Sequence, residues 1–544
     1  MDKISKYGEE VRKGLISGVN QLVKPVRVTL GAKGRLVGIY DSRTGSHVTK
    51  DGYTIARSID VSKDKIAAMS IDLVNQAIKK TNDLVGDATT TTAILCQQLI
   101  TKGLNNISNG ADPLKLKEGI ELGLDFVVKE IANVSTPVKD RIEQIATISG
   151  NNNAEIGATV AQAFEYAGNH EDSSIKVLAT DDEKTTIETV SGYKIDKGFL
   201  RDGFVNTKEG KCVYENPLIL LVHAKLNSFR DFMPLLNRIA EKHRRPLVII
   251  ADKFEGEFLS SVESSMANQI MKLEQAQREG NKDSYFQHIG LIQNPMALQS
   301  ASELYADIGT VVGYKGSHLS VIINDIEVED LGSADSIEIS RTTTYIKGGH
   351  GDKIKVSAKI KQLNVQLDDD KDLTEFEKLV LKNRIESLSG THAYIRVGGK
   401  GPAEMKESKD LFDDALNAVR SALKEGITAG GGSALLRIAD KMENTELPKD
   451  LEVARGWLIF AEAIQAPFYQ VMENAREKAD VIKDKILSSR IKNCGYNVLT
   501  KQYVNMINEG IIDPAMAERV ALENAVATAG LMYNMDAVVI ENLG

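Results

Sequence analysis

A turn followed by a row of hydroxyl side chains is the stretch of this sequence best suited to bind a phosphate. It reads Gly86-Asp-Ala-Thr-Thr-Thr-Thr92 and lies between two segments with helical apolar spacing. The first turn of a helix has unpaired N–H groups and the positive end of the helix dipole, so anions bind there. Asp87 would repel a phosphate unless Mg²⁺ took oxygen atoms from both. The alternative is a Thr-rich N-cap in which Asp87 only stabilises the first turn.

Two loops near the N-terminus carry similar chemistry. Thr29-Leu-Gly-Ala-Lys-Gly34 is a glycine-punctuated loop that could bring backbone N–H groups close to a phosphate. Lys50-Asp-Gly52 is a turn signal with a carboxylate at its tip. Taken singly, each loop is better explained by structure than by function, because short motifs often match by chance.

The C-terminal third holds three further candidates. Leu411 to Lys424 is a predicted helix in which Asp414 lies on a polar face, away from an apolar stripe. Ala429-Gly-Gly-Gly432 leads into a predicted helix at Ser433–Met442, and Ile511-Ile-Asp-Pro514 is part of a turn signal. A lone glycine triplet usually marks a flexible joint, and a lone carboxylate on a helix is usually solvated.

The elements that must position these residues fall into two kinds. With 544 residues, the chain exceeds one hydrophobic core and predicts about two to four domains. Residues 1 to about 134 read as mostly helix, apart from short strands at Gly34–Tyr40 and His47–Thr49, and helical patterns return after Gly390. From about residue 191, short strands alternate with helices, which favours an α/β module. The pattern predicts a discontinuous helical domain around an inserted α/β module.

Composition excludes several classes of protein. The formal net charge of −9, without a Lys/Arg stripe, argues against nucleic-acid binding. Cys96, Cys212 and Cys494 are too few and too scattered for a disulfide framework or a thiolate zinc site, which indicates a reducing compartment. No apolar run is long enough to span a membrane, and residues 1–10 lack the apolar core of a signal peptide. We therefore expect a soluble, cytoplasmic protein that binds no membrane.

In their order along the chain, the candidate loops resemble the nucleotide site of GroEL-type (group I) chaperonins. The resemblance covers nearly the whole chain, because Asp196-Lys-Gly-Phe-Leu200 and Phe254-Glu-Gly-Glu257 look like the family's apical domain. It implies a multidomain α+β chaperonin fold. A mainly helical equatorial ATP-binding domain would comprise residues 1–134 and 425–544, a small intermediate hinge domain 135–190 and 392–424, and an α/β apical substrate-binding domain 191–391.

The function that the resemblance implies is an ATP-dependent molecular chaperone. It would bind non-native polypeptides through an apical apolar groove and promote their folding through a cycle driven by ATP hydrolysis in a homo-oligomeric ring, heptameric by resemblance. The alternative is a ring-forming structural or scaffold protein that keeps a vestigial nucleotide site. A small-molecule kinase would need a dedicated substrate pocket, for which the sequence shows no motif.

The resemblance also assigns roles at the site, with ATP, Mg²⁺ and K⁺ as cofactors. Asp414 would be the catalytic aspartate, assisted by Asp51, and Asp87 would hold Mg²⁺. The backbone near Thr29 and Lys50 would hold K⁺. The residues around the phosphates would be Thr29, Leu30, Gly31, Ala32, Ala88, Thr89, Thr90 and Thr91, and those around the adenosine Gly431, Asn497, Val498, Leu499 and Asp513.

Five apolar residues match the family's substrate-binding positions, namely Phe199, Phe204, Met233, Leu236 and Leu259. Unfolded chains share little except exposed hydrophobic surface, so an apolar groove suits them. The alternative for all five is ordinary core packing, which the sequence without the resemblance would favour.

Several positions depart from the family pattern. Ala32 stands where the family usually has proline and Ala88 where it usually has glycine, so a positive φ at residue 88 would strain the backbone. Tyr469 and Lys478 stand where the family has an opposite-charge pair between rings, which leaves the number of rings open.

Two further departures lie in the predicted apical groove. Glu263 and Ser264 occupy positions that are apolar in the family. An unpaired carboxylate beneath a docked apolar loop would cost ~1–3 kcal/mol. We therefore expect a bacterial co-chaperonin lid to bind weakly or not at all, unless Glu263 turns to solvent.

Overall fold

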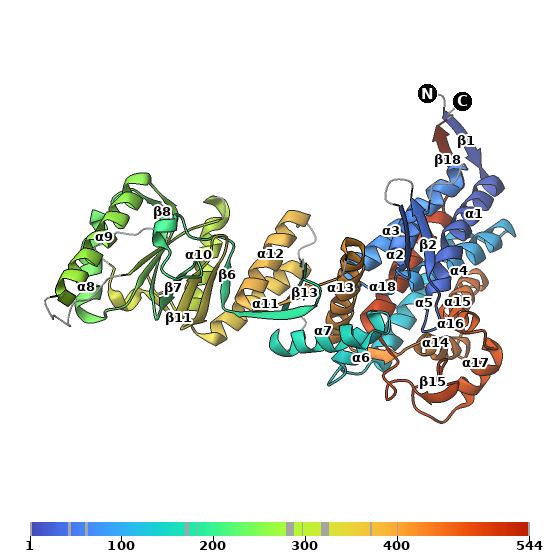
Figure 1. Cartoon of the computed structure of the whole chain (residues 1–544). Helices are drawn as coiled ribbons and strands as arrows, with labels where there is room; N and C mark the ends of the chain where they lie inside the picture. The colour runs from blue at the N-terminus through green and yellow to red at the C-terminus, as the bar shows by residue number, and fades with distance from the viewer. Residues whose placement is uncertain are drawn as a thin grey trace. The chain divides into compact units, whose positions relative to one another are not determined.

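The chain forms two compact units (Figure 1). The computed structural model describes residues 3–41, 45–59, 64–167, 169, 173–180, 182–278, 288–295, 298–316, 326–369, 373–399 and 401–541. The first unit comprises Met1–Ala163, Val177–Thr186 and Ile395–Gly544, and the second Phe164–Lys176 and Ile187–Tyr394. The first unit thus combines the two ends of the chain. The finer division into equatorial, intermediate and apical domains stays a prediction.

Long helices build the core of the first unit. These are α1 (Gly8–Val26), α3 (Lys65–Val85), α4 (Thr89–Ser108), α5 (Pro113–Val134), α15 (Leu451–Ala463) and α18 (Ala515–Tyr533). Their apolar stripes meet in one cluster that includes the fully buried Leu15, Leu95 and Phe460. Helices α5 and α15 approach closely because Gly119 lacks a side chain: a Cβ there would lie 1.9 Å from the Val453 carbonyl oxygen.

Shorter elements of the first unit surround this core. The helices are η1 (Arg27–Thr29), α2 (Gly52–Ser58), α6 (Ile142–Ser149), α7 (Ala154–Ala167, whose last residues enter the second unit), α13 (Pro402–Glu425), α14 (Ser433–Glu443), α16 (Ala466–Ala475) and α17 (Ala479–Ser488). Four antiparallel pairs complete it: β1 (Lys3–Tyr7) with β18 (Ala537–Glu541), β2 (Val37–Asp41) with β3 (Gly45–Thr49), β14 (Ile427–Ala429) with β17 (Ile512–Pro514), and β15 (Cys494–Asn497) with β16 (Gln502–Asn505).

The second unit is built on a mixed seven-stranded sheet of order β10-β9-β8-β11-β12-β6, with β7 paired to β11. The strands are β6 (Tyr193–Ile195), β7 (Cys212–Glu215), β8 (Leu218–Leu226), β9 (Leu247–Phe254), β10 (Ile289–Gln293), β11 (Gly332–Ile339) and β12 (Thr344–Gly349). Strands β8, β9 and β10 are parallel, with Leu218 beside Leu247 and Leu247 beside Ile289. Their continuous apolar runs are buried, as expected for parallel strands covered on both faces.

Helices complete the second unit. They are α8 (Met233–Lys242), α9 (Gly256–Arg278), α10 (Leu298–Val312), α11 (Lys353–Asp369) and α12 (Glu375–Leu388), with the short turns η2 (Asp202–Phe204), η3 (Arg230–Phe232) and η5 (Val328–Asp330). The chain passes between the units along β4 (Ser174–Ala179), β5 (Thr186–Ser191) and β13 (Thr391–Val397), which form a sheet of order β4-β13-β5.

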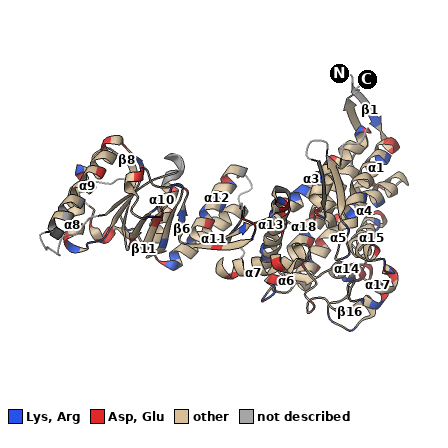
Figure 2. Cartoon of the chain, in the orientation of Figure 1, with Lys and Arg blue, Asp and Glu red and all other residues tan. Residues whose placement is uncertain are grey.

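Charge and hydropathy in the folded chain agree with the composition. Positive and negative side chains are mixed along the described helices of both units (Figure 2). In the part of the chain that the structure describes, no helix has the length and apolar character needed to cross a membrane.

Most predicted elements are present, with two differences of detail. The helix predicted from Leu411 is the end of α13, which begins earlier, at Pro402. Gly495-Tyr-Asn497 has the composition of a turn, and a turn prediction there is wrong, because Gly495 pairs with Val504 and the segment is strand β15. Gly280-Asn-Lys-Asp-Ser284 has the composition of an exposed loop, and this segment lies outside the described residues.

Candidate nucleotide site

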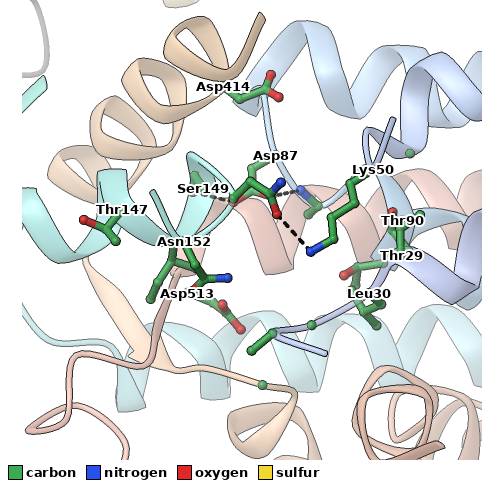
Figure 3. A pocket seen from close by; sticks show the side chains of 18 of the residues that line it. Thr29, Leu30, Lys50, Asp87, Thr90, Thr147, Ser149, Asn152, Asp414 and Asp513 are labelled. Atoms are coloured by element: carbon green, nitrogen blue, oxygen red, sulfur yellow. Dashed lines mark hydrogen bonds between the residues drawn. The ribbon is translucent and has the colours of Figure 1, made fainter. Parts of the chain in front are cut away.

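A pocket of about 1330 Å³ lies within the first unit and gathers residues from distant parts of the sequence (Figure 3). Its lining includes every residue that the sequence analysis assigned to the nucleotide, to Mg²⁺ and K⁺ and to catalysis: Thr29, Leu30, Gly31, Ala32, Lys50, Asp51, Asp87, Ala88, Thr89, Thr90, Thr91, Asp414, Gly431, Asn497, Val498, Leu499 and Asp513. The fold therefore brings the candidate loops to one place, although their individual roles stay predictions.

The turn between α3 and α4 presents a helix start to the pocket. Helix α3 ends at Val85, and α4 begins at Thr89, with Thr89, Thr90 and Thr91 on its first turn. The backbone at Ala88 is left-handed, with φ of +60°, immediately before this helix. An alanine in that conformation costs roughly 1–2 kcal/mol, so the strain considered for residue 88 is present.

The Asp87 carboxylate is held within this turn. One of its oxygen atoms accepts from the Ala88 N–H, and the other accepts from the Ser149 hydroxyl at 3.0 Å (Figure 3). A single carboxylate beside unpaired N–H groups suits Mg²⁺, which usually takes one or two protein carboxylates together with phosphate oxygens. Among the described residues, no group of three or more His, Cys, Asp and Glu side chains could hold a metal ion unaided. The single Asp87 carboxylate fits a cation that is also held by phosphate oxygens.

The loop after η1 is fixed by the polar contacts of two side chains, Thr29 and Asn474. The Thr29 hydroxyl donates to the Val26 carbonyl at 2.9 Å and lies 3.3 Å from the Thr90 hydroxyl. The Asn474 side-chain amide donates to the carbonyl oxygens of Arg27 and Leu30, at 3.0 and 2.9 Å. These contacts join the loop to α4 and α16. Backbone groups in such a fixed loop can meet a phosphate without first losing conformational freedom.

The turn between β3 and α2 carries Lys50 and Asp51. Asp51 is the N-cap of α2: its carboxylate accepts from the N–H groups of Tyr53 at 3.1 Å and Thr54 at 2.7 Å. The Lys50 ammonium donates to the Asn151 side chain at 3.2 Å. The cap fixes the direction of the Asp51 carboxylate within the pocket lining, and the assisting role stays a prediction.

Asp414 lies on α13 and enters the same pocket. Burial, together with the charges of Asp51 and Asp87, raises the pKa of Asp414 well above its ordinary range. Mutual repulsion of this kind is relieved when a divalent cation enters, because the cation interacts favourably with every carboxylate around it.

The opposite end of the pocket is formed by glycines and by strands β15 and β17. Gly431 has φ of +65°, and its N–H donates to the carboxylate of Asp513. The Asn497 side chain accepts from the N–H groups of Leu499 at 3.0 Å and Thr500 at 3.2 Å, which shapes the loop after β15. Burial, followed by the charge of Asp87, raises the pKa of Asp513 to about 7.

Sequence reasoning missed a set of polar residues around the end of α6. Thr147, Ser149, Asn151 and Asn152 all line the pocket, and both asparagines have positive φ. The sequence signal was a glycine followed by three asparagines directly before α7, which is a turn composition with polar side chains. Only the folded chain shows that this turn meets Asp87 and Lys50.

The five side chains predicted to line the apical groove are less exposed than expected. Met233 is 40% exposed, and Phe199 and Leu259 are half-buried. Phe204 and Leu236 are buried in the core of the second unit, as in the alternative interpretation of these residues. In this structure, only the first three offer apolar surface to a partner.

Glu263 is not the unpaired carboxylate on which the expectation of weak co-chaperonin binding was based. It accepts from the Arg201 guanidinium at 2.7 Å, and its side chain is 31% exposed. The expectation that it stands alone or turns fully to solvent is therefore corrected.

Tyr469, in the segment that resembles the contact between rings, donates its hydroxyl to Asp480 at 2.9 Å within the chain.

Comparison with known proteins identifies the fold. The model of the TCP-1/cpn60 chaperonin family matches residues 22–542. The structure is similar to two crystal forms of the chaperonin gp146 from the bacteriophage EL 2 (Pseudomonas aeruginosa), both obtained in the presence of ATP-BeFx. The first form has a TM-score of 0.66 and 21% identity, and the second a TM-score of 0.58 and 20% identity. Each match covers 99% of both chains. At this identity, the structural likeness shows the fold alone.

Proposed function

This chain belongs to the TCP-1/cpn60 chaperonin family, and on that premise we propose that it is an ATP-dependent molecular chaperone, which hydrolyses ATP and uses the resulting conformational cycle to fold non-native polypeptides. The observation that carries the proposal is the convergence of the Thr29 loop, Asp51, Asp87 with the α4 N-terminus, and Asp414 in one pocket. A family fold by itself does not establish an activity, so the site has to support it.

The proposed nucleotide orientation follows from the two ends of the pocket. The phosphates would lie at the start of α4, where N–H groups and threonine hydroxyls donate to their oxygen atoms. Asp87 would hold Mg²⁺, and the backbone near Thr29 and Lys50 would hold K⁺. The adenosine would lie between Gly431, the loop after β15 and Asp513, where the Asp513 carboxylate accepts from ribose hydroxyls.

Hydrolysis needs little covalent chemistry from the protein. A phosphoryl group passes to water when the water is oriented in line and the developing charge is stabilised, and Mg²⁺ supplies part of that stabilisation. In our proposal, Asp414 orients and deprotonates the water, and Asp51 assists from the opposite wall. The pKa of Asp414 is raised by burial and by the charges of Asp51 and Asp87, and a cation held at Asp87 would favour the ionised form that a base requires.

The second unit would bind the non-native polypeptide. Met233, Phe199 and Leu259 supply its apolar surface, and the movement that exposes or covers them would be driven by the nucleotide. In keeping with the family, we propose that copies of the chain assemble as a ring.

One experiment separates this function from its alternative. We expect the purified protein to hydrolyse ATP and to raise the yield of a chemically denatured test enzyme in an ATP-dependent manner. A ring-forming scaffold with a vestigial site would assemble without turnover and without refolding. Turnover without refolding would support the ATPase and contradict the chaperone.

A further inference from the structure

A second carboxyl group lies at the floor of the nucleotide pocket, beside Asp513. Glu518 is on the first turns of α18, lines the pocket and is only 5% exposed. Its Oε2 accepts from the Thr428 hydroxyl at 2.9 Å, and Thr428 is itself fully buried. Thr428 lies directly opposite Asp513 in the β14–β17 pair and also contacts the Asp513 carbonyl, at 3.3 Å. Glu518 is therefore built into the strand pair that presents Asp513.

No cation balances this carboxyl group within the described part of the chain. The neighbouring Arg519 is occupied by Glu425 of α13 and by Glu523, one turn further along α18. The titratable group that acts on Glu518 is Asp513, which is also an acid. A buried carboxylate with one neutral donor and no cation is strongly disfavoured, so the group keeps its proton. Burial, followed by the charge of Asp513, accordingly raises the pKa of Glu518 well above its ordinary range.

We propose that Glu518 is a proton-holding positioning residue of the nucleotide pocket, which fixes Thr428 and Asp513 while neutral and weakens nucleotide binding when it ionises. The inference rests on the proposed function, because it assigns the pocket to a nucleotide. It adds a residue that the candidate motifs did not contain.

The direction of the effect follows from charge. With Glu518 neutral, the floor of the pocket carries at most the one negative charge of Asp513. Loss of the proton at higher pH places a second buried negative charge there, and a bound anionic nucleotide further disfavours it. Binding therefore favours the protonated form, and affinity falls as the pH rises through the pKa of Glu518. A shift of one pKa unit between free and bound protein corresponds to a tenfold change in affinity.

The first test compares Mg·ATP binding by calorimetry between pH 6.5 and 9 for the wild type, Glu518→Gln and Glu523→Gln. The amide has the shape of the neutral acid and cannot ionise, so the Kd ratio of wild type to Glu518→Gln should rise about tenfold with pH. Titration of the nucleotide is common to all three proteins and cancels in the ratio. Glu523→Gln also removes a carboxyl group from α18, but outside the pocket. The Kd ratio of wild type to Glu523→Gln should therefore stay constant with pH. Parallel pH profiles for wild type and Glu518→Gln would overturn the proposal.

A second measurement needs no nucleotide. Infrared difference spectra of wild type minus Glu518→Gln, recorded at pH 7 without ligand, should contain the carbonyl band of a protonated carboxyl group. A carboxylate band in its place would overturn the proposal and leave the proposed function intact. Conversely, a protonated band together with no detectable nucleotide binding would contradict the proposed function and support the neutral state of Glu518.

Discussion

At the scale of single residues, the pocket depends on backbone conformations that the sequence only partly discloses. The glycine and alanine on either side of Asp87, Gly86 and Ala88, both have positive φ, of +63° and +60°. A glycine in such a turn is an ordinary sequence signal, whereas an alanine is not. From the sequence we could predict only that Ala88 would be strained if its φ were positive. The structure shows that its φ is positive.

Ala88→Gly should therefore stabilise the first unit. The substitution removes roughly 1–2 kcal/mol of left-handed strain and adds some entropy to the unfolded chain, so we expect a net gain of ~0.5–1 kcal/mol. Chemical denaturation followed by circular dichroism measures the change. Ala93→Gly in the regular part of α4 is the control and should destabilise. A loss of stability in Ala88→Gly would show that the strain is absent.

At the scale of elements, the sequence predicts which helices and strands form better than it predicts which residues contact one another. Apolar spacing located the long helices, and continuous apolar runs located β8 and β9, because both patterns follow from burial of one element. Ser149 and Asn474 were not foreseen, because each acts on a loop that is distant in sequence. Phe204 and Leu236 match a groove pattern yet lie in the core, because spacing does not reveal which neighbour covers a side chain.

A buried ion pair joins two helices of the second unit and offers a test of its packing. The Arg384 guanidinium on α12 donates to both oxygen atoms of Asp307 on α10, at 2.7 and 3.1 Å, and these side chains are 6% and 0% exposed. Arg384 also donates to the exposed Glu303 carboxylate at 2.5 Å, so removing Asp307 leaves the buried guanidinium with one acidic partner at the surface. Asp307→Ala should therefore lower the free energy of unfolding by about 3–5 kcal/mol.

The matched control is the exposed pair of Arg341 and Asp202, whose side chains are 79% and 78% exposed. Asp202→Ala should change stability by less than about 1 kcal/mol, because solvent screens the pair. Urea denaturation monitored by a probe in the second unit compares the two variants. Equal, small effects would mean that the buried pair is not a structural link between α10 and α12.

At the scale of the whole molecule, the division into two units is the feature most relevant to function. The candidate nucleotide pocket lies within the first unit, and the apolar surface proposed for clients lies within the second. A coupled cycle requires the conformation of one unit to affect the other. The chain crosses between them after Ala163, Lys176, Thr186 and Tyr394. The sequence predicted the inserted module from its change of pattern, although patterns alone cannot fix how units move.

The predicted apical surface also affects how tightly a co-chaperonin can bind. A docked apolar loop would have to cover the pair of Arg201 and Glu263 or displace it, and removing a partly exposed ion pair from water weakens binding. We expect a standard bacterial co-chaperonin to bind weakly, above micromolar Kd, in a calorimetric titration with ATP. The double variant Arg201→Met with Glu263→Val should bind more tightly. Submicromolar binding by the wild type would refute this expectation.

The central claim is that this pocket hydrolyses ATP with Asp414 orienting the water, and one paired measurement tests it most directly. Mg·ATP affinity and single-turnover hydrolysis would be measured for the wild type, Asp414→Ala and Asp87→Ala. Asp414→Ala should keep its affinity within a few-fold and lose at least about a hundredfold in rate, because the water is oriented only in the transition state. Asp87→Ala should lose affinity at limiting Mg²⁺, because it removes a metal ligand. Unchanged turnover in Asp414→Ala would contradict the account.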